Sequence, residues 1–281
     1  MRHDKHMKRS SKKTLGPVSA YLITQLKKAN KSIFRIRDAR RILDKDEKAA
    51  ADLLSKLVKR GIVSRLKAGL FMIVPFEAEK NYLENRYVIA REIMRPNRYY
   101  ISYASAMAIH GLTAHPVLNV QLSSTVRKKG LDISGIKFYF YLIRPSDYFG
   151  IEEKWVTKQE KVSVSDLERT ILDCLARPQL CGGVPEVAKW IWSAKEKIDY
   201  TKLLKYVKKI GIKAVAKRLG LILQLLELSD VNTLEELKKY AQSSEAYVLF
   251  DPTLKKAGKY LRKWRMCVNS DPGELKAAVW T

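Results

Sequence analysis

The stretch from Ser32 to Pro75 restricts the fold of this chain more than any other part of it. Its sequence, SIFRIRDARRILDKDEKAAADLLSKLVKRGIVSRLKAGLFMIVP, predicts a strand at 32–36, a helix at 37–43, a second helix and a β-hairpin. The second helix has an apolar stripe with the spacing of one buried helix face, formed by Ala50, Leu53, Leu54, Leu57 and Val58. This order of elements predicts a winged helix-turn-helix.

The ends of the second helix carry residues that commonly begin and end helices. Asp44 or Asp46 can cap its start, because a short carboxylate accepts hydrogen bonds from the unpaired backbone N–H groups there. Gly61 is expected to end it, since glycine is common just past a helix end. Both signals agree with the boundaries that the apolar stripe indicates.

A hairpin and an N-terminal helix complete the predicted domain. The hairpin strands at 62–66 and 70–74 are expected to turn at Lys67-Ala68-Gly69, where glycine can take a positive φ. A further helix runs from Pro17 to about Lys28 and has one apolar face that can pack on the other two helices. We therefore expect a winged-helix domain at 16–77.

The polar positions of this domain favour DNA binding. An α-helix fits the major groove, with its N-terminal residues nearest the base edges, and we predict that Lys48, Ala49 and Asp52 lie there. Phosphate contacts are predicted for basic residues of both helices, the turn and the hairpin, namely Arg37, Arg40, Lys45, Lys56, Lys59, Arg65 and Lys67. The alternative for any single lysine is a solvated helix face without a ligand.

The charge of the chain is uneven. Its net charge is +25, from 54 basic and 29 acidic residues. Residues 1–75 hold 20 Lys and Arg against 6 Asp and Glu, a surplus of 14 in about a quarter of the chain. This concentration favours a polyanionic partner at the winged helix, although part of the charge can serve solubility alone.

Several features indicate a cytoplasmic protein without a membrane partner. Residues 1–15 are expected to be a disordered basic tail, which is compatible with an arm on phosphates and with a solubilising tail. Cys174, Cys181 and Cys267 lack the spacing of zinc sites and favour a reducing compartment. No apolar segment has the length of a secretory signal or a membrane span.

The segment after the winged helix predicts a connecting helix and then mainly strands. A helix at Glu79–Met94, within a connecting segment at 78–96, is expected to end before Pro96. The next predicted elements are a helix at 103–109 and strands at 99–102, 118–124, 133–143 and 155–164.

Helices dominate the chain after Ser165. Ser165 and Glu168 have the spacing of a capping box at the start of the first of them. Further helices are predicted at 183–195, 200–208, 212–226 and 233–241, and two late strands at 246–250 and 264–268 can return to the sheet. The predicted class is α+β, with a winged helix followed by a domain at 97–281 that has a small mixed sheet and a helical half.

Five short motifs, taken in order, resemble one known family. They are SYASAMAIHGLT at 102–113, VSVSDLERTILDCLARP at 162–178, Gly182-Gly183, KRLG at 217–220, and Trp264 with Asn269. Together with the N-terminal winged helix, they make the chain similar to the AbiEi antitoxin family of transcriptional regulators in phage-defence systems. The resemblance covers nearly the whole chain, through motifs that are each short.

The resemblance implies a repressor that binds double-stranded operator DNA, as a dimer on inverted repeats or as monomers side by side, and autoregulates its operon. The DNA contacts it implies are Lys45, Lys48, Lys56, Arg65 and Lys67. It also implies that the C-terminal domain counters an AbiEii-type nucleotidyltransferase toxin, in a type IV toxin–antitoxin system. Arg169, Asp173 and Arg218 occupy motif positions for that antitoxin role, and they could as easily hold the domain together.

The sequence lacks the usual signatures of nucleotide enzymes. It contains neither a phosphate-binding loop nor Gly-Ser followed by Asp-x-Asp, so we predict a non-enzymatic protein without cofactor or metal. Asp166, Glu168 and Asp173 keep open the alternative of a metal-dependent nucleic-acid-processing enzyme. His110 and His115 do not have the spacing of a helical zinc motif. A further alternative is a regulator whose C-terminal domain binds a small ligand or only dimerises.

Overall fold

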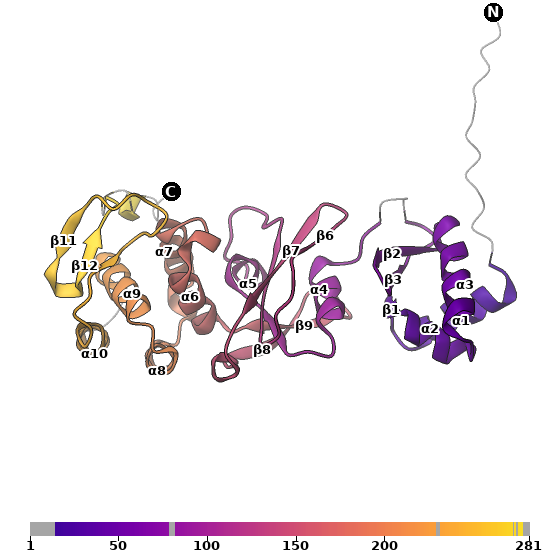
Figure 1. The fold of residues 1–281 in the computed structure, drawn as a ribbon. Helices are drawn as coiled ribbons and strands as arrows, with labels where there is room; N and C mark the ends of the chain where they lie inside the picture. The colour runs from indigo at the N-terminus through magenta and orange to yellow at the C-terminus, as the bar shows by residue number, and fades with distance from the viewer. Residues whose placement is uncertain (1–14, 79–81, 229–230, 272, 274, 278–281) are drawn as a thin grey trace, which may run out of the picture. The chain divides into compact units, whose positions relative to one another are not determined.

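The protein has an α+β fold made of two units. The computed structural model describes residues 15–78, 82–228, 231–271, 273 and 275–277 (Figure 1). The first unit extends to Ile93 and includes Ile133–Gly135, and the second comprises the other residues from Met94 onward. Both units combine helices with small sheets, which confirms the predicted fold class. Within the described residues, no helix is both long and apolar enough to cross a membrane.

The first unit is a winged helix-turn-helix. Its elements are α1 (Pro17–Lys28), β1 (Ile33–Arg35), α2 (Ile36–Leu43), α3 (Glu47–Lys59), β2 (Val63–Lys67) and β3 (Leu70–Ile73). The strands form an antiparallel sheet in the order β1-β3-β2, so that the apolar strand β3 lies in the middle. Every one of these helices and strands contributes to one core, which includes Leu22, Leu26, Phe34, Ala39, Leu54, Leu57, Val63 and Phe71.

Helix α4 (Arg86–Met94) is shorter than the helix predicted at Glu79–Met94. Residues 79–81 lie outside the described part of the chain, and the described residues just before Arg86 are not helical. The side chain of Asn85 accepts a hydrogen bond from the Tyr87 N–H at 2.9 Å. The helix therefore begins after Asn85, because this short polar side chain satisfies a free N–H group of the first turn.

The second unit contains a six-stranded mixed sheet. Its strands are β4 (Tyr99–Ile101), β5 (Val120–Ser124), β6 (Leu131–Ile133), β7 (Ile136–Leu142), β8 (Ile151–Trp155) and β9 (Lys161–Ser165). They lie in the order β6-β7-β5-β4-β9-β8, with β5–β7 and β4–β9 parallel and β4–β5 and β8–β9 antiparallel. Helix α5 (Tyr103–Ile109) follows β4 and packs against β5.

Two segments that were each predicted as one strand are β-hairpins in the structure. The strand predicted at 133–143 is interrupted at Ser134-Gly135, where both residues have positive φ angles of 52° and 83°. These two residues make the tight turn between β6 and β7. The strand predicted at 155–164 is also two strands, β8 and β9, and the turn between them closes with a 3.0 Å hydrogen bond from the Val156 N–H to the Glu160 carbonyl.

Five helices form the helical half of the second unit. They are α6 (Leu167–Ala176), α7 (Val184–Ser193), α8 (Tyr200–Ile210), α9 (Lys213–Leu225) and α10 (Val231–Gln242). Single 3₁₀ turns lie at Pro145–Asp147, Pro178–Leu180, Lys195–Lys197 and Arg262–Trp264. The core that the five helices share includes Leu172, Ile191, Leu219, Ile222, Leu237 and Trp264.

The start of α6 differs from the predicted capping box. Asp166 is the N-cap, because its Oδ1 accepts a hydrogen bond from the Arg169 N–H at 2.9 Å. Ser165 is instead the last residue of β9. The Glu168 carboxylate accepts a hydrogen bond from the Asp199 N–H at 3.0 Å, so it ties α6 to the start of α8.

The last three strands form a sheet of their own. They are β10 (Val248–Leu249), β11 (Lys259–Leu261) and β12 (Met266–Val268), in the order β10-β12-β11. The prediction that late strands return to the first sheet is wrong, and β11 was not predicted. Glycine is required at Gly258, because a Cβ there would overlap the Val268 carbonyl. Figure 1 shows this sheet in yellow beside α9 and α10.

Candidate nucleic-acid interface

The start of helix α3 is fixed by a single carboxylate. The Asp46 Oδ1 accepts a hydrogen bond from the Ala49 N–H at 2.7 Å, so Asp46 is the N-cap. Asp44 has a left-handed backbone, with φ 48° and ψ 52°, and ends α2. The turn between the two helices is therefore defined at both of its ends, which fixes how α3 presents its first turn.

Helix α3 has a buried and an exposed side. Ala50, Leu54 and Leu57 are buried in the core of the first unit. The residues predicted to contact DNA lie on the other side: Lys48, Asp52, Lys56 and Lys59 are exposed and Ala49 is half-buried. Among the described residues, no carboxylate forms an ion pair with any of these three lysines. This side of the helix thus presents a net positive charge to solvent, from three lysines and one aspartate.

The predicted residues of α2 and the turn lie beside this side of α3. Arg37, Arg40 and Lys45 are exposed, and the Arg40 Nη1 lies 3.2 Å from the Glu47 Oε2 at the start of α3. This exposed pair connects the two helices and partly neutralises Arg40. Of the three predicted cations, Arg37 and Lys45 therefore remain without an ion pair among the described residues.

One basic residue of α2 was missed from the predicted set. The side chain of Arg41 is 76% exposed, and its Nη2 lies 3.8 Å from the Asp38 Oδ1. Asp38 is held more closely by Lys31, at 2.9 Å, and by the Arg35 N–H at 2.8 Å. Burial raises the pKa of Asp38, but the hydrogen bonds and positive charges of these partners lower it by more. The pKa of Asp38 therefore lies below its usual value. In the sequence, Arg41 directly follows Arg40, which was in the predicted set, and this position was the signal for including it.

The hairpin of β2 and β3 forms the wing. Its tip contains Gly69 at φ 72°, and the Gly69 carbonyl accepts a hydrogen bond from the Ile36 N–H at 3.2 Å. The wing is therefore anchored to the first residue of α2. Arg65 is exposed and Lys67 is half-buried on β2. The structure brings the predicted basic residues of α2, α3 and the wing together in one small unit, an arrangement suited to contacting several phosphates.

The predicted antitoxin residues Arg169 and Asp173 lie inside the second unit. Arg169 is 3% exposed and Asp173 6%. The Arg169 Nε donates to the Asp173 Oδ1 at 2.9 Å, and its Nη2 donates to the Tyr100 hydroxyl at 3.0 Å. Its guanidinium also lies over the Phe149 ring, 4.4 Å from the centroid. Burial raises the pKa of Asp173 by more than Arg169 and Tyr100 lower it.

Arg218, the third predicted antitoxin residue, is an internal clamp. Its guanidinium donates to the carbonyls of Phe250, Leu175 and Leu249 at 2.9, 2.8 and 3.1 Å, and so joins α9 to α6 and β10. Burial lowers the pKa of Arg218. Arg169, Asp173 and Arg218 therefore direct their polar groups inward, and we infer that they support the fold.

The motif residue Gly220 has a packing role. Trp264 lies so close that a Cβ on Gly220 would overlap its six-membered ring. The Trp264 Nε1 donates to the Gln224 Oε1 at 3.0 Å, one turn further along α9. Two of the motifs that carry the family resemblance, KRLG and the late tryptophan, therefore meet in one buried contact.

The carboxylates considered for metal chemistry already have protein partners. Lys202 lies 3.1 Å from the Asp166 Oδ2 and 2.7 Å from the Glu168 Oε2. Burial lowers the pKa of Lys202, but hydrogen bonds to these two carboxylates raise it above its usual value. The His110 Nε2 donates to the Ser165 carbonyl at 2.8 Å. In the part of the chain that the structure describes, no three His, Cys, Asp or Glu side chains are arranged to hold a metal ion.

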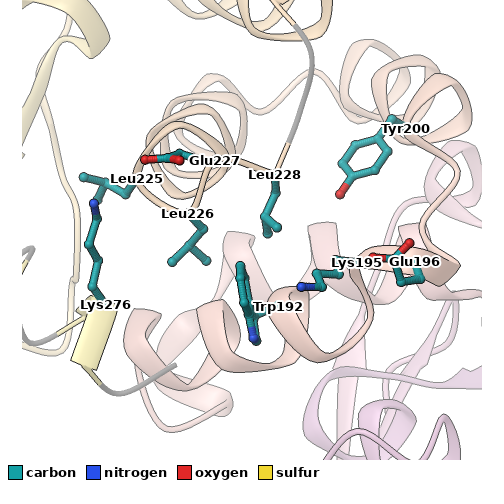
Figure 2. A pocket seen from close by; sticks show the side chains of 9 residues that line it. All are labelled: Trp192, Lys195, Glu196, Tyr200, Leu225, Leu226, Glu227, Leu228 and Lys276. Atoms are coloured by element: carbon teal, nitrogen blue, oxygen red, sulfur yellow. The ribbon is translucent and has the colours of Figure 1, made fainter. Parts of the chain in front are cut away.

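A pocket of about 520 Å³ lies near the C-terminal ends of α7 and α9 and the start of α8 (Figure 2). Its walls combine aromatic, aliphatic and charged side chains: Trp192, Lys195, Glu196, Tyr200, Leu225, Leu226, Glu227, Leu228 and Lys276. The Lys195 Nζ lies 3.8 Å from the centroid of the Trp192 ring, an arrangement typical of a cation–π contact. The volume is within the range of small-molecule sites, but four of the nine lining side chains are charged, which is more than such sites usually have.

Comparison with known proteins identifies a solved structure of similar fold but no family. No family model matches the chain, and no curated protein matches it. Among solved structures, it is similar to the crystal structure of the RV2827C protein from Mycobacterium tuberculosis, with a TM-score of 0.69 over 95% of this chain and 96% of that chain. The two sequences are 11% identical, so the similarity shows a common fold.

Proposed function

We propose that this protein is a DNA-binding transcriptional repressor that autoregulates its operon and counters an AbiEii-type nucleotidyltransferase toxin. The geometry of the first unit supports the DNA-binding part. The motifs that resemble the AbiEi family support the part that concerns autoregulation and the toxin. The two parts involve different units of the chain, so they can be tested separately.

The exposed side of α3 carries the proposal. It presents Lys48, Lys56 and Lys59 without ion pairs among the described residues, next to the basic wing. An α-helix enters the major groove, where donors and acceptors of the base edges are accessible. Lys56 and Lys59 would approach phosphates, which position the protein on the duplex, and Lys48 in the first turn would lie near the base edges. A solvated helix face would require none of the neighbouring basic elements.

Charge removal on α3 tests the DNA-binding part. We expect Lys48→Ala combined with Lys56→Ala to weaken binding to duplex DNA from upstream of the gene. The slope of log affinity against log salt should fall by about 0.9, the contribution of the one phosphate contact that is predicted for Lys56. Lys208→Ala with Lys238→Ala removes the same charge from exposed ion pairs of the second unit and is the matched control. Equal affinities and slopes for both variants would remove α3 from the interface.

Growth rescue tests the antitoxin part. We expect this protein to restore growth of a bacterial host that expresses a neighbouring nucleotidyltransferase gene. The Lys48→Ala and Lys56→Ala variant should rescue as well as the wild type, since its second unit is unchanged. Normal toxicity in the presence of the folded wild-type protein would refute the antitoxin part and leave the DNA-binding part standing.

The pocket of Figure 2 favours a second candidate, a repressor regulated by a small ligand. A planar ligand could contact Trp192, while Lys195 or Lys276 would neutralise an anionic group on it. Nucleoside monophosphates are suitable probes, because they combine a ring with a phosphate. This candidate predicts that a probe raises the unfolding temperature of the wild-type protein and not that of Leu226→Lys, in which the pocket is obstructed.

A further inference from the structure

Two exposed tyrosines lie on the sheet formed by β10, β12 and β11. Tyr260 is 64% exposed and Tyr247 is 46% exposed. Their ring centroids are 5.3 Å apart, with an angle of 76° between the ring planes. Neither hydroxyl has a hydrogen-bond partner among the described residues. The edge-to-face contact leaves ring surface of both side chains open to solvent.

The strand register places both tyrosines on the outer face of this sheet. Tyr260 pairs with Cys267, and Cys267 pairs in turn with Leu249, two residues from Tyr247. Because side chains alternate along a strand, these four residues share one face. Met266 points to the other face and belongs to the core of the second unit. The sheet is thus held to the core through the face of Met266, while on the other face Cys267 is buried and both tyrosines stay exposed.

A run of uncompensated basic residues borders the tyrosines. Residues 252–263 contain no acidic residue and five exposed basic ones, Lys255, Lys256, Lys259, Arg262 and Lys263. None of the five forms an ion pair with a described residue. Asp251, which precedes the run, is buried and accepts a hydrogen bond from the Val184 N–H at 2.8 Å. Glu245 lies 3.8 Å from Arg265, which is outside the run.

We propose that this surface, defined by Tyr247, Tyr260 and the basic run 255–263, binds a single strand of nucleic acid. Phosphates would contact the cations, and an unstacked base would stack on a tyrosine ring, as in sequence-tolerant single-strand binding sites. The bases of a duplex are stacked against one another inside the helix, so the tyrosines give single strands an advantage. This activity is independent of duplex binding by α3.

Two simpler explanations account for only part of this surface. Lysines on an edge strand such as β11 prevent pairing with other chains, which explains Lys259 but not two exposed tyrosines. An acidic protein partner would be attracted to the cations. Tyrosine rings serve protein interfaces as well, but nucleobases present a π-face at every nucleotide beside a phosphate, and so match both the rings and the cations.

Binding of labelled oligouridine and oligothymidine of about 12 nucleotides tests the proposal, with full-length protein at roughly physiological salt. We expect Tyr247→Ala with Tyr260→Ala to weaken both complexes by about five- to hundredfold, the range for loss of base stacking. Tyr247→Phe with Tyr260→Phe keeps the rings and should keep the affinity. Tyr139→Ala, at an exposed tyrosine of β7, is the control for loss of an aromatic side chain elsewhere.

Charge variants and a competitor distinguish a single strand of nucleic acid from an acidic protein as the partner of this surface. Lys259→Gln with Arg262→Gln should lower the salt slope for oligouridine by about 1.4, since each contact to a single strand contributes about 0.7. Duplex binding by the double-alanine tyrosine variant should equal that of the wild type. The proposal is overturned if that variant binds oligouridine as the wild type does. Displacement of oligouridine by polyglutamate at the same concentration of charge would also overturn it, in favour of an acidic protein partner.

Discussion

Helix α3 of the first unit and helix α6 of the second both carry basic residues, but in opposite environments. Lys48 and Lys56 on α3 are exposed and have no ion pair among the described residues. Arg169 on α6 is 3% exposed and bonds to the carboxylate of Asp173 and the hydroxyl of Tyr100. Charges of the first kind are available to a ligand, whereas those of the second kind are satisfied by the fold.

This difference shows why the net charge of +25 is not by itself evidence for a binding site. Arg218 adds to the same total, yet its guanidinium is used to join three backbone carbonyls. Exposed lysines without partners must carry any electrostatic attraction for a polyanion. Mutation of the two kinds of residue should therefore give opposite results, with stability affected in one unit and binding in the other.

The largest expected effect is on stability in the second unit. Asp173→Ala should lower the free energy of unfolding by about 3–5 kcal/mol, because it leaves the buried Arg169 guanidinium without its counter-charge. Denaturant unfolding measures this change. Replacing both residues, as Arg169→Met with Asp173→Leu, should recover part of the loss, since no buried charge remains. A cost below about 1 kcal/mol for Asp173→Ala would mean that the pair does not support the fold.

A smaller effect should appear as a pH dependence of stability. Burial lowers the pKa of His110, while the Ser165 carbonyl acts in the opposite direction. The folded protein therefore binds the proton less readily than the unfolded chain, whose His pKa is about 6.5. Stability is complete above that pH and falls as the pH drops from about 6.5 toward the lowered pKa, by about 1.4 kcal/mol for each unit of pKa difference.

His110→Gln tests this assignment. The variant should show a flatter dependence of unfolding free energy on pH between about 5 and 7, where histidine is the main titrating side chain. His115→Gln is the matched control, since the protein would lose a histidine while the His110 contact with Ser165 is kept. An unchanged pH profile in the His110 variant would assign the dependence to another group.

The smallest expected effect is on stability in the first unit. Lys48→Ala with Lys56→Ala should change the free energy of unfolding by less than about 0.5 kcal/mol, as for exposed residues without specific partners. Thermal unfolding of the variant and the wild type gives this comparison. A loss of more than 1 kcal/mol would show that these lysines have a structural role, and the contrast between the two units would no longer hold.

The local signals of the first unit were sufficient to predict its fold. The apolar stripe of α3, the capping Asp46 and the turn glycine Gly69 all appear in the structure as expected. Each signal acts over a few residues, so no long-range information was needed. The assignment of base and phosphate contacts within this unit stays a prediction.

The elements that the sequence did not predict depend on turns or on distant contacts. Ser134 takes a positive φ, which is uncommon for a residue with a side chain, so the turn between β6 and β7 was concealed in an apolar run. Strand β11 is short and basic, and it is recognisable only from its pairing with β12. The burial of Arg169 depends on Tyr100 and Phe149, which are distant in sequence, whereas its spacing from Asp173 indicates only that the two side chains can pair on one helix.

Fluorescence anisotropy with duplex DNA tests the central claim most directly. The duplex is taken from just upstream of the gene and compared with a shuffled duplex at roughly physiological salt, because a protein of charge +25 binds any DNA at low salt. We predict a preference of about a thousandfold for the upstream duplex, as for specific DNA-binding proteins. Equal and weak binding to both duplexes would contradict the assignment of a repressor.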